Sequence, residues 1–240
     1  MSNSDKPEKS NFATLGTART DLAGVGDATV DTIHRLHRSG SKPLVFIRHS
    51  AREYGKAFND LDNPLSDPGR ALAYSLGQRL PAFDEIVTWT SPSGRCVETA
   101  ELIAAGSPMS AQPNQTHEDL SVFYVRDMRR VGGMLKHQGS DATLSAWFRG
   151  EVDANWMTPA SASANRLIAR LAHIRDSAEP GQLTLVVSHD WNLYLLRTLL
   201  LGTPFGDLPQ PEYLEALAIW EDGGALMASD PHHVPQIVRL

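Results

Sequence analysis

The sequence has little of several features that would place a protein in a special class. One cysteine, Cys96, stands in 240 residues, which excludes an intramolecular disulfide framework and fits a reducing compartment. No apolar run approaches the roughly 20 residues of a membrane span, and the first 20 residues lack the apolar core of a secretory signal. The net charge is −6, whereas nucleic acids and anionic membranes select a basic face. We therefore expect a soluble, cytoplasmic protein with no nucleic-acid partner and no membrane partner.

The patterning that is present favours one α/β domain. Residues 1–20 are polar with little to bury, so we expect them to be disordered or draped on the surface. Residues 21–240 are long enough to bury a substantial core as a single domain. Three short apolar segments, at 44–47, 85–90 and 183–187, have the composition of buried strands, and each runs into a turn and a helix. This alternation predicts a mostly parallel central sheet.

Capping residues and apolar spacing predict the helices around these strands. Asp27 is expected to cap a first helix. Ser66 is expected to cap a second helix, whose buried face holds Leu72, Leu76 and Leu80. Further helices are predicted from about residue 94 and over 161–177 and 192–201.

The regular pattern loosens in the middle segment, residues 107–159. Long excursions between core elements often form lids or substrate walls, so we assign this segment to specificity. Within it we predict a strand in 117–124, a loop over 127–133 and a short helix over 141–150. After the last helix, the sequence predicts an edge hairpin over 214–228 and then an exposed tail with His232 and His233.

Cationic and titratable side chains follow each of the three predicted strands. They are Arg48, His49 and Arg52 after the first, Arg95 after the second, and His189 and Asp190 after the third. Because the carboxyl ends of parallel strands meet at one edge of a sheet, these side chains should lie together. Arginine forks match the oxygens of a doubly charged tetrahedral anion. We therefore expect a phosphate pocket and a small phosphorylated substrate.

This set of residues also suggests a reaction. The surrounding positive charge should lower the pKa of His49 and keep it neutral and nucleophilic. A neutral imidazole can attack phosphorus in line, while the arginines and a protonated His189 stabilise the transferring group, with no metal and no other cofactor. The leaving oxygen needs an acid, for which Asp190 is the first choice, followed by Glu118 and then Asp127.

These motifs resemble those of the histidine phosphatase superfamily, which also contains phosphoglycerate mutases and histidine acid phosphatases. The segment RHSAR, Arg48–Arg52, is similar to the family's RHGxR signature. The segment SPSGRCVETA, residues 91–100, resembles its SPxxRCxxTA signature, and VSHD, residues 187–190, corresponds to the strand that ends in the second histidine. The resemblance runs from about residue 44 to about 202. It implies a phosphoglycerate mutase-like, three-layer α/β/α sandwich.

The resemblance also implies roles for single residues. His49 corresponds to the residue that accepts the phosphoryl group, and Arg48, Arg52, Arg95 and His189 to the residues that bind phosphate. Asp190 is similar to the proton donor of the acid phosphatase branch. The mutase-like branch instead uses a glutamate from the middle segment, for which Glu118 is the candidate.

One position departs from the family pattern, because Ser50 stands where the family usually has glycine. A serine there could add a hydroxyl contact or narrow the pocket. The leading hypothesis is a metal-independent phosphatase that hydrolyses a phosphate monoester through a phosphohistidine at His49. A phosphomutase of the same fold is the first alternative. A catalytically silent member that binds a phosphorylated ligand or acts as a scaffold is the second.

Overall fold

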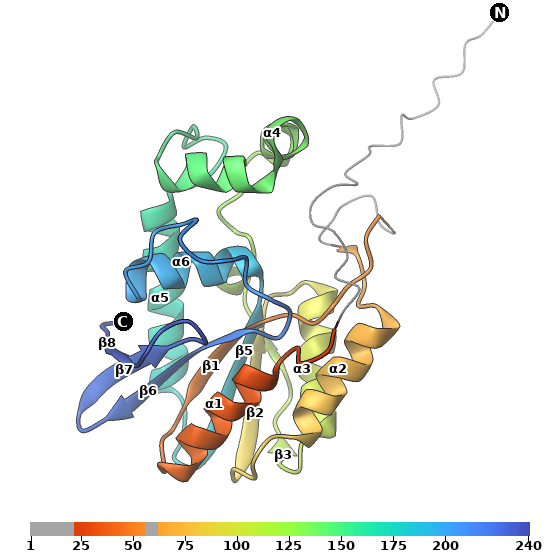
Figure 1. Cartoon of the computed structure of the whole chain (residues 1–240), viewed down its shortest axis with the longest axis vertical. Coiled ribbons are helices and arrows are strands. Elements are labelled where there is room, and N and C mark those ends of the chain that lie inside the picture. The colour runs from red at the N-terminus through yellow and green to blue at the C-terminus, as the bar shows by residue number, and fades with distance from the viewer. Residues whose placement is uncertain (1–21, 56–61) are drawn as a thin grey trace, which may run out of the picture.

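The computed structural model describes residues 22–55 and 62–240, so the prediction for residues 1–20 lies outside the described residues. Figure 1 shows a central sheet with helices on both faces and one helical segment beyond one end of the strands. The helices are α1 Asp27–Arg38, α2 Asp67–Gln78, α3 Gly94–Gly106, the 3-10 helix η2 Glu118–Leu120, α4 Met128–Phe148, α5 Ala160–Asp176 and α6 Asp190–Leu200. The strands are β1 Leu44–Arg48, β2 Glu85–Thr90, β3 Ser110–Ala111, β4 Gln115–Thr116, β5 Gln182–Ser188, β6 Ala216–Asp222, β7 Ala225–Ser229 and β8 Gln236–Ile237. No helix in the described ranges is long and apolar enough to cross a membrane.

The sheet has eight strands in the order β3-β2-β5-β1-β6-β7-β8, with β4 also paired to β2. Its core is parallel, because β5 pairs in parallel with both β1 and β2. The prediction of a mostly parallel central sheet is therefore confirmed. The hairpin over 214–228 exists, but the prediction that it lies at an edge is wrong, because β6 pairs antiparallel with β1. The first five residues of β6 are all buried, as expected of a strand covered on both faces.

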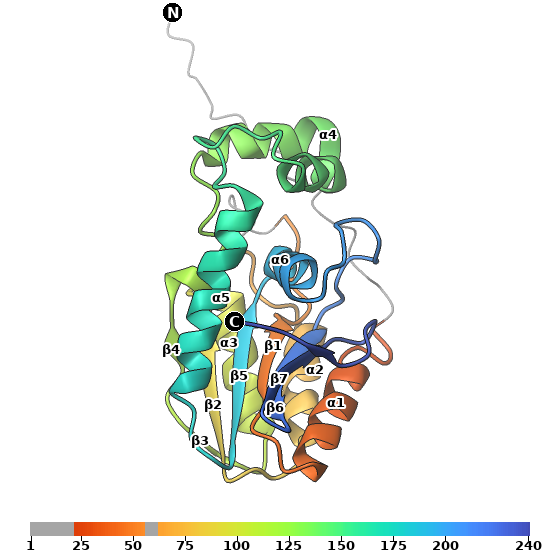
Figure 2. The same cartoon turned by 90° about the vertical axis from the view of Figure 1, so that its left-hand side faces the viewer.

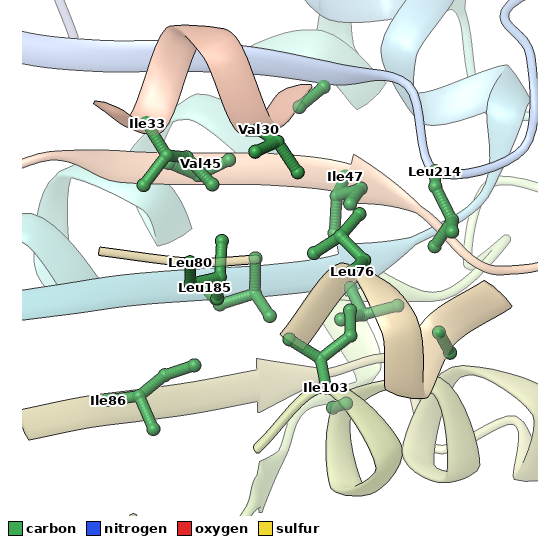
Figure 3. Close-up of a cluster of buried hydrophobic side chains, with 14 of the residues drawn as sticks. Val30, Ile33, Val45, Ile47, Leu76, Leu80, Ile86, Ile103, Leu185 and Leu214 are labelled. Atoms are coloured by element: carbon green, nitrogen blue, oxygen red, sulfur yellow. The ribbon is translucent and has the colours of Figure 1, made fainter. Parts of the chain in front are cut away.

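Alternate residues of β1 pack against opposite helical layers. Val45 and Ile47 belong to a cluster with residues of α1, α2 and α3, part of which Figure 3 shows. Leu44 and Phe46 belong to a second cluster with residues of α5 and α6. Figure 2 shows the sheet between these two layers. Burial on both faces explains why the strand is a continuous apolar run.

Helices α2 and α3 approach each other unusually closely. A Cβ atom on Gly77 would lie 2.1 Å from the Ile103 carbonyl oxygen, and one on Gly106 would lie 2.3 Å from the Tyr74 carbonyl oxygen.

Ser66 caps α2 as predicted, since its Oγ accepts a hydrogen bond from Gly69 N at 3.2 Å.

The buried face of α2 differs from the leucine stripe that the spacing predicted. Its buried residues are Gly69, Ala73, Leu76 and Gly77. The helix ends at Gln78, so Leu80 is buried beyond the helix and not on its face. Gly77 fits the close approach of α3, and Gly69 fits that of the Ala51 carbonyl oxygen, which an added Cβ would meet at 1.9 Å.

The middle segment is more helical than predicted. Helix α4, Met128–Phe148, consists of two helical stretches that meet at the non-helical Gly139 (φ 83°, ψ 173°). The second stretch agrees with the short helix predicted over 141–150, whereas the loop predicted over 127–133 is helical from Met128 onward. Asp127 caps α4, because its Oδ1 accepts from Arg130 N at 3.0 Å. The strand predicted in 117–124 is instead η2 followed by a turn. The apolar residues of the turn, 122–124, join a separate aromatic cluster, in which Tyr124 and Trp147 are fully buried.

Two further predictions near the chain ends are wrong. Asp27 does not cap α1. The cap position is Gly26, at φ 84°, and the Asp27 carboxylate instead pairs with Arg79 Nη2 at 2.7 Å. His233 is not in a free tail. Its two ring nitrogens lie 2.6 Å from Asp230 Oδ1 and 2.6 Å from Thr203 Oγ1.

Candidate active site

The carboxyl ends of β1, β2 and β5 lie at one edge of the sheet. β1 pairs with β5 as far as Arg48 and Ser188, and His49 N donates to Ser188 O at 2.9 Å just beyond. β2 ends beside β5 in the same way, so Ser91 follows it at the same edge. The register of the sheet thus places His49, Ser91 and His189 at the start of three neighbouring turns.

His49 and His189 face each other with ring centroids 5.6 Å apart and ring planes at 72°. Both are almost completely buried, with 2 % and 3 % of their surface exposed. Arg95, in the first turn of α3, lies between them. Its Nε is 3.0 Å from His49 Nε2, and its Nη2 is 3.4 Å from His189 Nδ1. One guanidinium therefore contacts both imidazoles.

The hydrogen-bond partners of His49 fix its tautomer. Nδ1 lies 2.8 Å from the Ser50 carbonyl oxygen, which can only accept, so Nδ1 carries the hydrogen. Nε2 faces Arg95 Nε, which can only donate, so Nε2 presents a lone pair. Burial first, and then the charges of Arg95 and Arg48, hold the pKa of His49 well below its ordinary value. The ring is neutral, and the lone pair of Nε2 accepts the hydrogen bond from Arg95.

His189 is also neutral in this structure, and the protonated form that the sequence predicted for the phosphate-bound site stays a prediction. Its Nε2 lies 3.0 Å from Ser91 Oγ. Burial and the neighbouring Arg95 lower its pKa to about 3, against the opposing effect of Asp190.

Arg48 is held on three sides by residues of α6 and of the segment that precedes β6. Its Nη1 donates to the Pro211 carbonyl oxygen at 2.5 Å, and its Nη2 lies 3.0 Å from Asp190 Oδ2. The guanidinium carbon sits 4.3 Å from the centroid of the Tyr213 ring. Gln210 Nε2 donates to the same Asp190 oxygen at 2.9 Å. Arg48 is 7 % exposed, and these contacts fix its guanidinium group in position.

Arg52 lies over a second tyrosine. Its guanidinium carbon is 4.1 Å from the centroid of the Tyr54 ring, and the Tyr54 hydroxyl lies 2.5 Å from the Tyr213 hydroxyl. The two tyrosines thus support Arg48 and Arg52 from one side. The charge of Arg52 also contributes to the low pKa of His189, which places it within electrostatic reach of the site.

The three candidate proton donors lie in different environments. Burial alone raises the pKa of Asp190, but Arg48 and two hydrogen-bond donors outweigh it and leave the pKa below its ordinary value. Glu118 is exposed on η2, directly after β4, which pairs with the end of β2. Asp127 serves as the cap of α4 by accepting from Arg130 N. Asp190 is the one of the three that contacts a phosphate-binding candidate, Arg48.

The one cysteine of the chain, Cys96, lies beside His189. Cys96 is buried 3.7 Å from His189 Nε2, and burial raises the pKa of its thiol to about 12, so it is not a thiolate. In residues 22–55 and 62–240, no three His, Cys, Asp or Glu side chains are grouped so that they could hold a metal ion.

Ser50 does not project into the pocket. It is fully buried, and its hydroxyl donates to the Gly69 carbonyl oxygen at 2.7 Å. Its backbone N–H donates to Thr99 Oγ1 at 3.1 Å. The serine therefore ties the turn after β1 to α2 and α3, and the contact or narrowing expected from the sequence is not observed.

Sequence reasoning missed the residues that come from the segment between α6 and β6. Tyr213 and Gln210 contact Arg48 and Asp190, yet neither belongs to a periodic pattern or to a family signature. They reach the site because β6 runs antiparallel beside β1, which brings the residues before β6 to the carboxyl end of β1. A prediction that the hairpin pairs with β1, and does not lie at an edge, would have indicated these residues.

The comparisons with known proteins agree with this geometry. No curated protein matches the chain in sequence. Among solved structures, YhfR of Bacillus stearothermophilus has a TM-score of 0.61 at 24 % identity, over 80 % of this chain and 98 % of that one. A phosphoglycerate mutase of Bacillus anthracis has a TM-score of 0.57 at 19 % identity, over 80 % and 94 %. A mycobacterial hydrolase has a TM-score of 0.54 at 18 % identity, over 79 % and 96 %.

These likenesses establish the fold as an α/β sandwich of the phosphoglycerate mutase-like type. The family assignment rests on sequence: the model of the histidine phosphatase superfamily (branch 1) matches residues 44–219, which include all three strand ends described above. The chain belongs to the histidine phosphatase superfamily, branch 1.

Proposed function

We propose that this protein is a metal-independent phosphatase that hydrolyses a small phosphate monoester through a phosphohistidine at His49. One observation carries the proposal: a neutral His49, with its Nε2 lone pair in the buried site, faces His189 across 5.6 Å with Arg95 between them. Histidine can serve as a covalent nucleophile when it is neutral and oriented. Both conditions are met here by burial and by the Ser50 carbonyl.

Phosphate binding follows from the charges. Three buried arginines, Arg48, Arg52 and Arg95, surround the two imidazoles. A phosphate dianion offers oxygens that bind guanidinium groups more strongly than a neutral imidazole nitrogen does. We infer that Arg95 turns from His49 Nε2 to a phosphate oxygen, which frees the lone pair for attack.

The reaction then has two steps. In the first, His49 Nε2 forms a bond to phosphorus, the bond from phosphorus to the ester oxygen breaks, and the departing oxygen takes a proton from an acid. In the second, water attacks phosphorus, the N–P bond breaks, and the proton of that water returns to the carboxylate. The arginines stabilise the charge on the transferring group in both steps.

We assign the acid to Asp190, with Glu118 as the alternative. The bound dianion competes with the Asp190 carboxylate for Arg48 and repels it, and both effects raise the pKa of Asp190. A carboxyl that is ionised in the free protein thereby takes up the proton that the leaving oxygen needs. Glu118 is exposed on η2.

The test is turnover of p-nitrophenyl phosphate with EDTA present, in wild type and His49→Ala. We expect wild-type turnover and a loss of at least about 10³-fold in kcat for the variant, because the variant lacks the proposed nucleophile. Equal turnover in the two proteins would exclude the proposal. Inorganic phosphate should protect both folded proteins from thermal unfolding, which shows that the variant keeps its pocket.

The same preparation separates the two alternative functions. A phosphomutase passes the phosphoryl group to a second substrate hydroxyl, so an added alcohol acceptor would collect most of the phosphate. A silent binding member would be stabilised by phosphate without turnover on any ester of a panel of sugar, nucleotide and amino-acid phosphates. We expect release of inorganic phosphate to water instead.

A further inference from the structure

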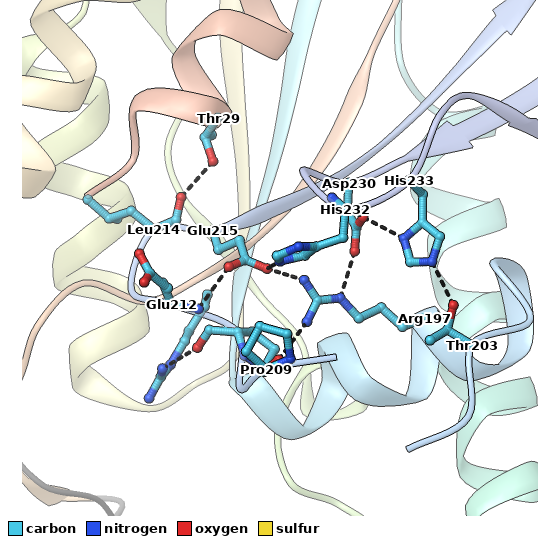
Figure 4. A network of polar contacts seen from close by, with 12 residues as sticks. Thr29, Arg197, Thr203, Pro209, Glu212, Leu214, Glu215, Asp230, His232 and His233 are labelled. Carbon is cyan, nitrogen blue, oxygen red and sulfur yellow. Dashed lines mark hydrogen bonds and ion pairs between the residues drawn. The ribbon is translucent and has the colours of Figure 1, made fainter. Parts of the chain in front are cut away.

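A buried cluster of charges lies behind the candidate site and takes no part in the proposed chemistry. Arg197 of α6 is 2 % exposed and lies between two carboxylates, Glu215 and Asp230, as Figure 4 shows. Its Nε donates to Asp230 Oδ2 at 2.6 Å, and its Nη2 donates to Glu215 Oε1. The two carboxylates are also nearly buried, at 9 % and 7 %. Burying three charged groups is costly, and the contacts of the cluster show what it holds in place.

The cluster fixes both ends of the segment that joins α6 to β6. Arg197 Nη1 reaches the Pro209 carbonyl oxygen at 3.5 Å, and Glu215 Oε2 accepts from Glu212 N at 3.0 Å. On the other side, Asp230 binds His233, whose second nitrogen contacts Thr203 Oγ1 near the start of the segment. Residues 203–215 are therefore tied to one guanidinium from several directions.

The same segment makes the contacts that set the candidate site. Gln210 donates to Asp190, the Pro211 carbonyl accepts from Arg48 Nη1, and the Tyr213 ring lies under the Arg48 guanidinium. These contacts fall between Pro209 and Glu215, the two points at which Arg197 holds the segment.

The backbone of this segment is strained at one residue. Leu214, at φ 56°, is the one non-glycine residue with positive φ in the described ranges. A leucine in this region persists only where the surroundings hold it. Leu214 is fully buried in the cluster of Figure 3, and its carbonyl accepts from Thr29 Oγ1 at 2.7 Å. Its N–H donates to Arg48 O at 3.2 Å, and Glu215 O accepts from Arg48 N at 3.0 Å, so the strained turn is joined directly to Arg48.

We propose that Arg197, together with Glu215 and Asp230, is the positioning element that holds residues 209–215 against Arg48 and so sets Arg48 for phosphate. This inference rests on the proposed phosphate site. Arg197 touches neither His49 nor His189 in the contacts of this structure, so it acts through the segment and is not a catalytic residue.

The first test is the dissociation constant for inorganic phosphate, measured by titration calorimetry at a temperature where every variant is folded. Arg197→Met should weaken phosphate binding about 10-fold or more, and Arg197→Lys, which keeps the charge but not the fork, should fall in between. Leu171→Ala is the matched control. Leu171 is fully buried in α5 away from the segment, so this variant should lose thermal stability yet bind phosphate within about 2-fold of wild type. Wild-type affinity in a folded Arg197→Met variant would overturn the inference.

A second comparison tests the route through Arg48. In an Arg48→Ala background the further change Arg197→Met should weaken phosphate binding by less than about 3-fold, because the group that Arg197 positions is gone. A full 10-fold effect in that background would show that Arg197 acts elsewhere.

A crystal structure of Arg197→Met separates failure of this inference from failure of the proposed function. We expect the contact between Arg48 Nη1 and the Pro211 carbonyl to be lost and residues 209–215 to move. Superposition of this segment and of Arg48 on the wild-type protein would overturn the inference, whether or not the wild type turns over any ester. Phosphate binding without turnover in the wild type would instead count against the proposed function alone.

Discussion

Each ring nitrogen of His49 has a partner that fixes its role. The Ser50 carbonyl holds the hydrogen on Nδ1, and Arg95 Nε points at the lone pair of Nε2. The sequence predicted a neutral histidine from its cationic neighbours, and in the structure burial is the larger cause of its low pKa. The sequence predicted which residues form the site because each of them follows an apolar strand. The effect of burial on their protonation could not be predicted, since burial depends on the whole packed fold.

The role of Asp190 can be tested by leaving-group dependence. With Asp190→Asn we expect kcat/KM for an alkyl phosphate such as glycerol phosphate to fall about 10²- to 10⁴-fold, the usual effect of losing a general acid. For p-nitrophenyl phosphate, whose leaving group needs little protonation, the loss should stay within about 10-fold. Glu118→Gln is the matched comparison. If it shows this asymmetry and Asp190→Asn does not, Glu118 is the donor.

The structural role of Ser50 gives a second prediction. Ser50→Gly should leave kcat/KM within about 3-fold of wild type but lower the free energy of unfolding by about 1–2 kcal/mol, through a lost buried hydrogen bond and a more flexible unfolded chain. Ser50→Ala, measured by urea unfolding alongside it, isolates the hydroxyl. A tenfold gain of activity in Ser50→Gly would mean that the serine narrows the pocket after all.

At the scale of helices and strands, the predictable elements are those whose pattern is imposed by burial. β1, β2 and β5 were readable as apolar segments, and α5 and α6 from their spacing and the glycines and prolines that follow. The stretch of α4 before Gly139 was not, because Gly132 and Gly133 lower its helix propensity and mimic a loop. The Asp127 cap was the signal that could have found its start.

The close contact of α2 and α3 makes an element-scale prediction. Gly77→Ala should destabilise the protein by about 2 kcal/mol or more, although alanine is the better helix former, because the added Cβ would meet the Ile103 carbonyl at 2.1 Å. Gly133→Ala is the matched control in α4, where an added Cβ has nothing within 4 Å. It should stabilise by up to about 1 kcal/mol.

Chemical denaturation of the two glycine variants measures both effects on one scale. Equal changes in the free energy of unfolding would show that the helices can separate without cost, and the packing account of α2 and α3 would be wrong.

At the scale of the whole molecule, the site lies where two helical layers and a helical cap meet one sheet edge. Figure 1 shows α4 beyond the strand ends, on the side where the site residues lie. The fold class and the order of the site residues followed from the sequence, because strand-helix alternation and right-handed connections leave few arrangements. The contribution of residues 209–215 did not follow, because it depends on β6 pairing beside β1.

The buried histidines make the stability of the whole protein depend on pH. The pKa of His189 is lowered to about 3 in the folded protein, and that of His49 is also lowered. Below the ordinary histidine pKa, both side chains are therefore protonated in the unfolded chain while they are still neutral in the folded protein. Stability is therefore full above the unfolded pKa of about 6.5 and is lost as pH falls below it. From pH 7 to pH 5 the lowered pKa of His189 should cost about 2 kcal/mol, and the lowered pKa of His49 adds to this loss.

Urea unfolding in phosphate-free buffer at the two pH values tests this. His189→Asn should reduce the loss by about 2 kcal/mol, because it removes one of the two groups. An unchanged pH dependence in this variant would mean that His189 is protonated in the folded protein. The lowered carboxylate pKa values of Asp190 and Asp230 act at lower pH and do not interfere.

The central claim is that His49 carries the phosphoryl group. Rapid mixing with p-nitrophenyl phosphate, quenching in alkali and mass spectrometry of the peptides tests it most directly, because phosphohistidine survives alkali. We predict a phosphoryl group on the peptide that contains His49, formed within one turnover and absent from His49→Ala. Turnover without phosphorylation of that peptide, or with phosphorylation of another residue, would contradict the account.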